Sequence, residues 1–202
     1  MSNSMQDEHF ATNKYYDRHF AKDAAKILPG EYFVSKTGVL LVTVLGSCIA
    51  ACIRDPLIGV GGMNHFMLPD DGAKGGVTTS ARYGTYAMEV LINHLLKLGA
   101  KKDRLEAKVF GGGAVLASLS SSNVGVRNAE FVLEYLQMEG IPVLARDLLE
   151  SCPRKVYYFS DSGRVLVKRL NRVHNDTLYT REQTYKASLA KQPVGGDVEL
   201  FI

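Results

Sequence analysis

The sequence has no tryptophan and only three cysteines among its 202 residues. So few cysteines, in an odd number, cannot supply a disulfide framework and are typical of a reducing compartment, so we expect free thiols and a cytoplasmic location. Long hydrophobic runs are also missing, since none approaches the roughly 18 residues that a membrane-spanning helix needs. Charges occur throughout residues 1–26, so the sequence predicts no secretory signal there.

Neither sign of charge dominates the chain. The 24 lysines and arginines against 21 aspartates and glutamates leave a formal net charge of +3. A protein built to bind nucleic acid usually carries a larger basic excess gathered in a stripe, so we expect no nucleic-acid partner. With 46% hydrophobic and 22% charged residues, the composition is that of an ordinary globular protein, and the length fits one domain.

Polar segments flank a more hydrophobic central region. Residues 1–26 are polar and mixed in charge, and we expect an N-terminal arm with one helical turn near residues 16–26. Residues 173–202 are again mostly polar and form a predicted C-terminal extension. The central domain is therefore expected to span residues 27–172.

Hydrophobic periodicity predicts two helices and several strands in this domain. One helix is expected over residues 80–98 and a second over 128–140, with Asn128 as its N-cap. Strands are expected over 31–36, 39–45, 48–53, 58–68, 105–110, 141–146, 156–159 and 164–170, the last two forming a hairpin. Strand and helix do not alternate regularly, so we predict an α/β (α+β) fold with a mixed sheet arrangement.

The first candidate for chemistry is Cys48, which follows a break in an apolar run at Gly46-Ser47. A bend there would expose the thiol, and a histidine that lowers its pKa would make it a nucleophile and also transfer protons. His65 lies beyond a predicted turn, so two neighbouring strands would bring it beside Cys48. Composition alone favours the alternative of a buried structural cysteine and an unrelated histidine, because free cysteine is among the most buried residue types.

Two further motifs have weaker chemical interpretations. Cys52 lies on the same face as Cys48, but a structural zinc site needs four ligands and a second cysteine pair is absent, so we expect a packed core thiol and no metal. The glycines at 111–113 follow a strand as a phosphate loop does, yet the residues after them match neither nucleotide fingerprint. Close backbone packing explains these glycines at least as well as a ligand site.

Several longer blocks are more specific in combination. They are VLGSC (44–48), RDP (54–56), GGMNHFMLP (61–69), KVFGG (108–112), NVGVRN (123–128) and GRV (163–165). Together they resemble the CheD family, the chemoreceptor glutamine deamidases of bacterial chemotaxis, over roughly residues 27–172. The resemblance reverses the expectation for Cys48, and it implies a fold similar to the catalytic domain of a deamidating bacterial toxin. It thereby implies the finer architecture, packed mixed β-sheets with helices outside.

The resemblance also implies a catalytic set. Cys48 would be the nucleophile, His65 its proton-transfer partner, and Thr43 the third member that orients the imidazole. The expected substrate or oxyanion contacts are Ser47, Gly46 and Asn64. The implied reaction hydrolyses the side-chain amide of a receptor glutamine through a cysteine thioester, giving glutamate and ammonia, with no cofactor and no metal.

The family further implies partners and an alternative role. The expected partners are methyl-accepting chemotaxis receptors, through which alone the protein would reach a membrane. The alternative is a binding module that stimulates a CheC-type phosphatase of the phosphorylated response regulator. A third interpretation, an unrelated cysteine hydrolase of small amides, fits the Cys48 and His65 pair but not the length of the match.

Overall fold

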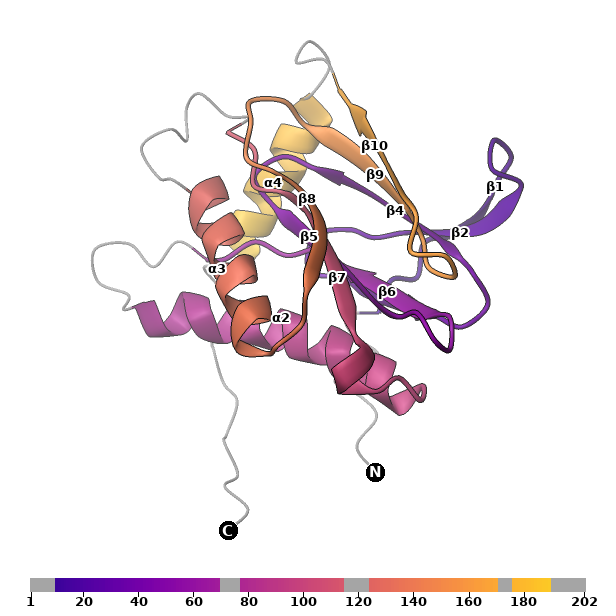
Figure 1. The fold of residues 1–202 in the computed structure, drawn as a ribbon. Helices are drawn as coiled ribbons and strands as arrows, with labels where there is room; N and C mark the ends of the chain where they lie inside the picture. Colours follow the sequence, from indigo (N-terminus) through magenta and orange to yellow (C-terminus); the bar gives the residue numbers. More distant parts are fainter. Residues whose placement is uncertain (1–9, 70–76, 115–123, 171–175, 190–202) are drawn as a thin grey trace, which may run out of the picture.

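The computed structural model describes residues 10–69, 77–114, 124–170 and 176–189, and within them the chain forms two five-stranded sheets and three α-helices (Figure 1). The first sheet contains, in spatial order, β1 (Lys14–Asp17), β2 (Lys22–Lys26), β4 (Leu40–Leu45), β9 (Arg154–Phe159) and β10 (Val165–Arg169). The second contains β3 (Tyr32–Ser35), β6 (Val60–Asn64), β5 (Ile49–Asp55), β7 (Glu106–Gly111) and β8 (Val143–Leu148). The helices are α2 (Val77–Lys97), the short 3-10 helix η1 (Lys102–Arg104), α3 (Val124–Met138) and α4 (Asp176–Leu189). This arrangement confirms the predicted α+β class.

The N-terminal segment differs from its prediction, because residues 14–26 form a β-hairpin and not a helical turn. Strand β2 lies parallel to β4, with Ala24 opposite Leu40, and so extends the first sheet. In the hairpin turn, Asp17 Oδ1 accepts hydrogen bonds from the backbone N–H groups of His19 and Phe20. Backbone pairing with a strand distant in sequence outweighs a weak local helical preference.

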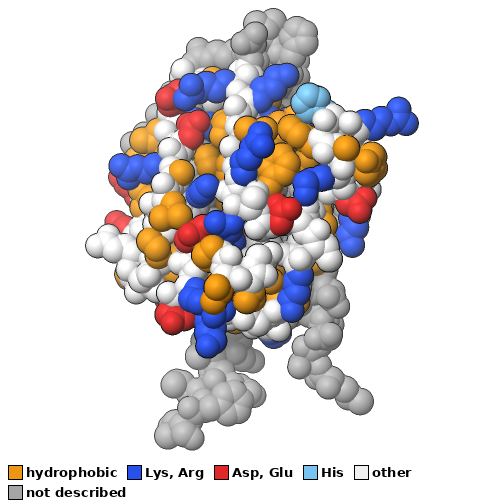
Figure 2. Space-filling model, turned by 45° about the vertical axis from the view of Figure 1, so that its right-hand side comes forward, with side chains coloured by type: hydrophobic (Ala, Val, Ile, Leu, Met, Phe, Trp, Pro, Cys, Tyr) orange, Lys and Arg blue, Asp and Glu red, His pale blue; other side chains and the backbone are white. Residues whose placement is uncertain are grey.

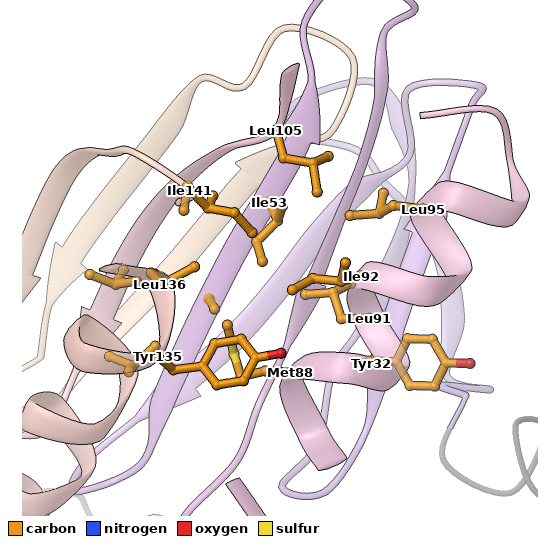
Figure 3. Close-up of a cluster of buried hydrophobic side chains, with 14 of the residues drawn as sticks. Tyr32, Ile53, Met88, Leu91, Ile92, Leu95, Leu105, Tyr135, Leu136 and Ile141 are labelled. Carbon is orange, nitrogen blue, oxygen red and sulfur yellow. The ribbon is translucent and has the colours of Figure 1, made fainter. Parts of the chain in front are cut away.

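Helices α2 and α3 cover the outer face of the second sheet (Figure 1). In the core beneath them, Ile53 of β5 lies among Leu95 of α2 and Leu136 of α3 (Figure 3). Both helices begin earlier than the periodicity predicted, α2 at Val77 and α3 at Val124. Asn128 is therefore inside α3 and does not cap it.

A second hydrophobic layer lies between the two sheets. Leu41 and Leu45 of β4 pack there with Ala50 of β5 and Met63 of β6. At one end of this layer the chain crosses from the first sheet to the second through residues 46–48. This crossing contains the candidate nucleophile, so the fold places it at the margin of the core.

The outer face of the first sheet carries a smaller cluster that includes Leu40, Val42 and Phe159. On the molecular face turned forward in Figure 2, lysine and arginine side chains are interspersed with acidic and hydrophobic ones. The described lysines and arginines on that face are therefore separated by acidic and hydrophobic side chains and form no continuous basic patch there.

Helix α4 arises from the segment for which the sequence predicted only a polar extension. The remainder of that extension, residues 173–175 and 190–202, lies outside the described residues, as do residues 1–9 of the N-terminal arm. None of the described helices combines the length and the hydrophobicity that crossing a membrane requires.

Candidate active site

Cys48 lies in the turn between β4 and β5. The bend does not expose the thiol as the sequence predicts, because the side chain is fully buried beneath Glu182 of α4. The glycine segment after β7 holds this turn, because the Gly112 N–H donates to the Cys48 carbonyl at 2.8 Å and the Gly113 N–H donates to the Gly46 carbonyl at 2.7 Å. The approach requires glycine at position 111, where φ is +115° and an added Cβ would lie 2.0 Å from the Cys48 carbonyl oxygen. The glycine segment thus serves close backbone packing, the alternative that the sequence had left open.

Asn128 completes the support of the turn. Its fully buried side chain donates from Nδ2 to the Ser47 carbonyl at 2.9 Å and accepts from the Leu68 N–H at Oδ1, also at 2.9 Å. Residues 46, 47 and 48 therefore all have their carbonyls bound by fixed donors. Such a turn keeps its geometry when a ligand arrives, because its backbone groups are already committed.

The sheet register brings His65 to the same face as Cys48. Ile49 and Phe66 form an antiparallel bridge with two hydrogen bonds of 2.9 Å. In that register His65 is the diagonal neighbour of Cys48, and diagonal neighbours are about 7–8 Å apart at the backbone, within reach of an aromatic side chain. The expected side-by-side placement on neighbouring strands therefore agrees with the register.

Thr43 anchors the imidazole of His65. The Thr43 hydroxyl donates to the Ile27 carbonyl at 2.7 Å, so its only proton is used there, and it lies 2.8 Å from His65 Nδ1. It therefore accepts a hydrogen bond from an Nδ1–H group. The 3.4 Å contact between Nδ1 and the Ile27 carbonyl requires the same proton. Both contacts assign the proton to Nδ1 and leave Nε2 with a free lone pair.

The Nε2 atom of His65 is buried and has no hydrogen-bond partner among the described residues. A buried polar atom without a partner is rare, and Nε2 is therefore available to accept a proton or a hydrogen bond from a substrate or a neighbouring thiol. An unprotonated Nε2 on the same face as a thiol is the arrangement of a general base for a cysteine.

The carboxylate of Glu182, on α4, binds two backbone N–H groups of the turn at residues 46–48. The backbone N–H groups of Gly46 and Ser47 donate to Glu182 Oε1 at 2.9 and 3.1 Å, and the Ser47 hydroxyl donates to Oε2 at 2.8 Å. Glu182 itself is only 3% exposed. Two successive N–H groups that converge on one anion form a small anion-binding nest. Its position beside the thiol is that of an oxyanion site.

The same carboxylate shapes the charge state of the pair. Burial, the charge of Glu182 and a hydrogen bond to it raise the pKa of the Cys48 thiol well above its usual range. Burial, together with the positive charge of Arg181, lowers the pKa of His65 to about 4, although the hydrogen bond to Ile27 acts in the opposite direction. With α4 in place, the pair is a neutral thiol beside a neutral imidazole at pH 7.

Among the residues expected from the sequence, Asn64 is placed differently. It accepts from the Ala51 N–H at 3.0 Å and donates to the Ala87 carbonyl at 3.0 Å, so its amide connects β5 and α2 on the face opposite to Cys48. Its amide is therefore engaged in holding β5 and α2 together, and a substrate contact by Asn64 stays a prediction. The alternation of a strand sends the neighbouring residues 64 and 65 to opposite faces.

Cys52 lies in the hydrophobic layer between the sheets, as a packed core thiol does, and burial raises its pKa. Within the described part of the chain, no group of three or more His, Cys, Asp or Glu side chains is arranged to hold a metal ion. The residues that sequence reasoning missed are Glu182 and the turn-binding role of Asn128. Glu182 has no local signal, because it acts across 136 positions of sequence.

Comparisons with known proteins identify the family of the chain. A family model described as "CheD chemotactic sensory transduction" matches residues 67–169. The chain is 71% identical over 196 residues to the "Probable chemoreceptor glutamine deamidase CheD 1" of Dechloromonas aromatica, covering 97% of this chain and 98% of that protein. It is 63% identical over 196 residues to a protein of Herminiimonas arsenicoxydans with the same description, without the final number, covering 96% and 97%.

Among solved structures, the hypothetical protein YfiH of Bacillus licheniformis has a TM-score of 0.38 and 12% identity, covering 59% of this chain and 49% of that one. This likeness is too slight to carry an argument. The family model and the nearly full-length relatives together establish that the chain belongs to the CheD family.

Proposed function

We propose that the protein is a chemoreceptor glutamine deamidase in which Cys48 is the nucleophile. The observation that carries the proposal is the buried His65 imidazole, fixed by Thr43 at Nδ1 and unpartnered at Nε2, on the same face as a thiol whose turn binds a carboxylate. The names of the full-length relatives support the substrate class, a receptor glutamine. We further propose receptors as its partners and the cytoplasm as its compartment.

The first half of the reaction forms a thioester. His65 Nε2 takes the thiol proton, and the Cys48 sulfur attacks the side-chain amide carbon of the glutamine. The N–H groups of Gly46 and Ser47 then hold the developing oxyanion in place of the Glu182 carboxylate. When the tetrahedral intermediate collapses, the imidazolium of His65 gives its proton to the nitrogen, and ammonia leaves.

The second half consumes water. His65, again neutral, takes a proton from a water molecule as it attacks the thioester carbonyl, and the same N–H groups hold the second oxyanion. Breaking the carbon–sulfur bond releases a glutamate side chain and restores the Cys48 thiol. Thr43 keeps the Nδ1–H tautomer throughout, which is the role of the third member of a triad.

The proposal is tested with a receptor cytoplasmic fragment from the same organism. Wild-type protein is expected to release ammonia and to add about 1 Da to the fragment per converted glutamine, because an amide becomes an acid through the thioester. Cys48→Ala and His65→Ala should abolish both signals, whereas Cys152→Ala, which removes a partly exposed free thiol that the proposed reaction does not use, should not.

Two results would contradict the proposal. One is full activity in Cys48→Ala. The other is an unchanged receptor mass with the wild type and also with Glu182→Ala, which removes the carboxylate from the turn. Cys48→Ala also distinguishes the deamidase from the alternative role, stimulation of a CheC-type phosphatase. If the Cys48→Ala protein still binds and stimulates such a phosphatase, that role does not depend on the thiol.

A further inference from the structure

Helix α4 presents one continuous row of side chains to the site. Leu178, Glu182, Tyr185 and Leu189 follow one another at spacings of four, three and four residues, which places them on one face of a helix. Leu178, Glu182 and Leu189 are buried, and Tyr185 packs against the hydrophobic layer between the sheets. Figure 1 shows α4 beside the crossing from β4 to β5. The helix is therefore docked through this row, with Glu182 near its middle.

The surface on which α4 docks, its seat, includes the turn at residues 46–48, Gly30 and Tyr83 of α2. It accommodates the aromatic ring of Tyr185. The hydroxyl groups of Tyr83 and Tyr185 are hydrogen-bonded to each other, which ties α4 to α2. The ring of Tyr185 also lies against Gly30, where an added Cβ would come within 3.0 Å of it. Arg181, next to Glu182, is close enough to His65 for its charge to lower the pKa of the imidazole. Two successive residues of α4 thus act on the charge states of the candidate pair, Arg181 on His65 and Glu182 on Cys48.

The chemistry of the docked residue matches the product of the proposed reaction. A glutamate side chain is what the deamidation of a glutamine leaves behind, and Glu182 is held by the two N–H groups that would stabilise the oxyanion. The Ser47 hydroxyl adds a third donor at 2.8 Å. A carboxylate and an amide have nearly the same shape. An amide oxygen can accept the two N–H hydrogen bonds that Glu182 Oε1 accepts, and the Ser47 hydroxyl can turn to accept from the amide N–H group.

We propose that α4 is an intramolecular product mimic, which closes the site with Glu182 and occupies the seat of a substrate helix that presents its glutamine in the same way. This inference rests on the proposed function and adds two points to it. The substrate segment is helical, and it competes with α4 for the turn at residues 46–48. The enzyme is closed until α4 leaves its seat.

Cys48 alkylation tests the closure without any receptor. Full-length wild type, Glu182→Ala and the control Thr184→Ala are treated with iodoacetamide at pH 7.5, and modification of Cys48 is followed by peptide mass mapping. Thr184 lies on the exposed side of α4, so its loss should leave the rate unchanged. Glu182→Ala should react about tenfold faster or more, because undocking α4 exposes the thiol and removes the carboxylate, and burial and that carboxylate both oppose the thiolate. A rate equal to or below that of the wild type would overturn the proposal.

Glu182→Gln tests the mimicry and preserves the shape of the helix. If α4 docks as a substrate does, the introduced glutamine is itself deamidated, and the peptide spanning position 182 gains about 1 Da unless Cys48 is also replaced by alanine. Protein that deamidates receptors but leaves the introduced glutamine intact would refute the mimicry. A third outcome would separate the two proposals: Glu182→Ala is alkylated faster, but neither a receptor nor the introduced glutamine is deamidated. That result would show that α4 covers Cys48 and would refute the proposed deamidase function.

Discussion

Replacing Thr43 by valine tests how the imidazole of His65 is held. The Thr43 hydroxyl lies between two buried groups, donating to the Ile27 carbonyl at 2.7 Å and contacting His65 Nδ1 at 2.8 Å. Thr43 and His65 are 1% and 2% exposed, so water cannot readily replace the lost contacts. Valine has nearly the same volume as threonine, so the change removes two hydrogen bonds without leaving a cavity.

The magnitude follows from what the unpaired groups can still do. Leaving a buried donor or acceptor without its partner costs about 1–3 kcal/mol. The Nδ1–H group can turn toward the Ile27 carbonyl, which already lies 3.4 Å away, and recover part of that cost. We therefore expect Thr43→Val to lower the free energy of unfolding by about 1–3 kcal/mol. A less firmly oriented base should lower kcat by about 10-fold to 100-fold, at about 1.4 kcal/mol per factor of ten.

The assay is ammonia release from a receptor fragment, with kcat and KM measured separately, beside a urea unfolding curve. Thr43 acts through His65 and does not touch the substrate, so kcat should fall while KM changes little. Thr43→Ser keeps the hydroxyl and should restore most of the activity. A folded valine variant with wild-type kcat would refute the anchoring role, and a serine variant as slow as the valine variant would attribute the loss to packing.

Two further predictions concern the scaffold. Gly111→Ala should abolish activity and cost about 3 kcal/mol or more, because its Cβ would meet the Cys48 carbonyl, whereas Gly140→Ala, at a φ of +68° with no atom near its Cβ, should cost about 1 kcal/mol. Equal losses in thermal denaturation of the two variants would count against the close approach. At Asp55, burial acts to raise the pKa, but hydrogen bonds from Arg104 and the backbone hold the pKa below its usual value. The unfolded chain therefore binds this proton first, so the stabilisation is complete above the unfolded pKa of about 3.9 and is lost as the pH falls through the folded value. Urea midpoints measured from pH 6 to pH 3 should decline less steeply in Asp55→Asn, and identical slopes would contradict the assignment.

Much of the fold could be predicted from local patterns. The helices α2 and α3 were expected because apolar side chains recur at helical spacing, and the sheet strands because β-branched runs end at turn residues. The error at residues 14–26 has a clear cause. That segment is polar and short, and it forms strands because β2 pairs with β4 and β1 pairs with β2. Pairing between segments distant in sequence leaves no trace in local periodicity.

Some residues of the candidate site could likewise be inferred from the sequence, and others could not. Cys48, His65 and Thr43 lie in short sequence blocks, and the chemistry of a thiol, an imidazole and a hydroxyl can be inferred from residue type and order. Asn64 is expected from the sequence to contact the substrate, but its hydrogen bonds to β5 and α2 depend on which face of β6 turns toward α2. Which of two sequence neighbours on a strand faces the site is decided by the pairing register, and residue type alone does not give it.

The sequence by itself determined the family, the candidate nucleophile and its base, since these depend on residue identity in compact motifs. Only the tertiary structure decided that a polar C-terminal segment forms α4 and that Glu182 closes the turn at Gly46 and Ser47. It also decided that Asn128 binds that turn. The physical reason is that hydrogen bonds from side chains to a distant backbone depend on where two segments meet in space. That meeting is set by packing of the whole chain and not by the residues on either side of each group.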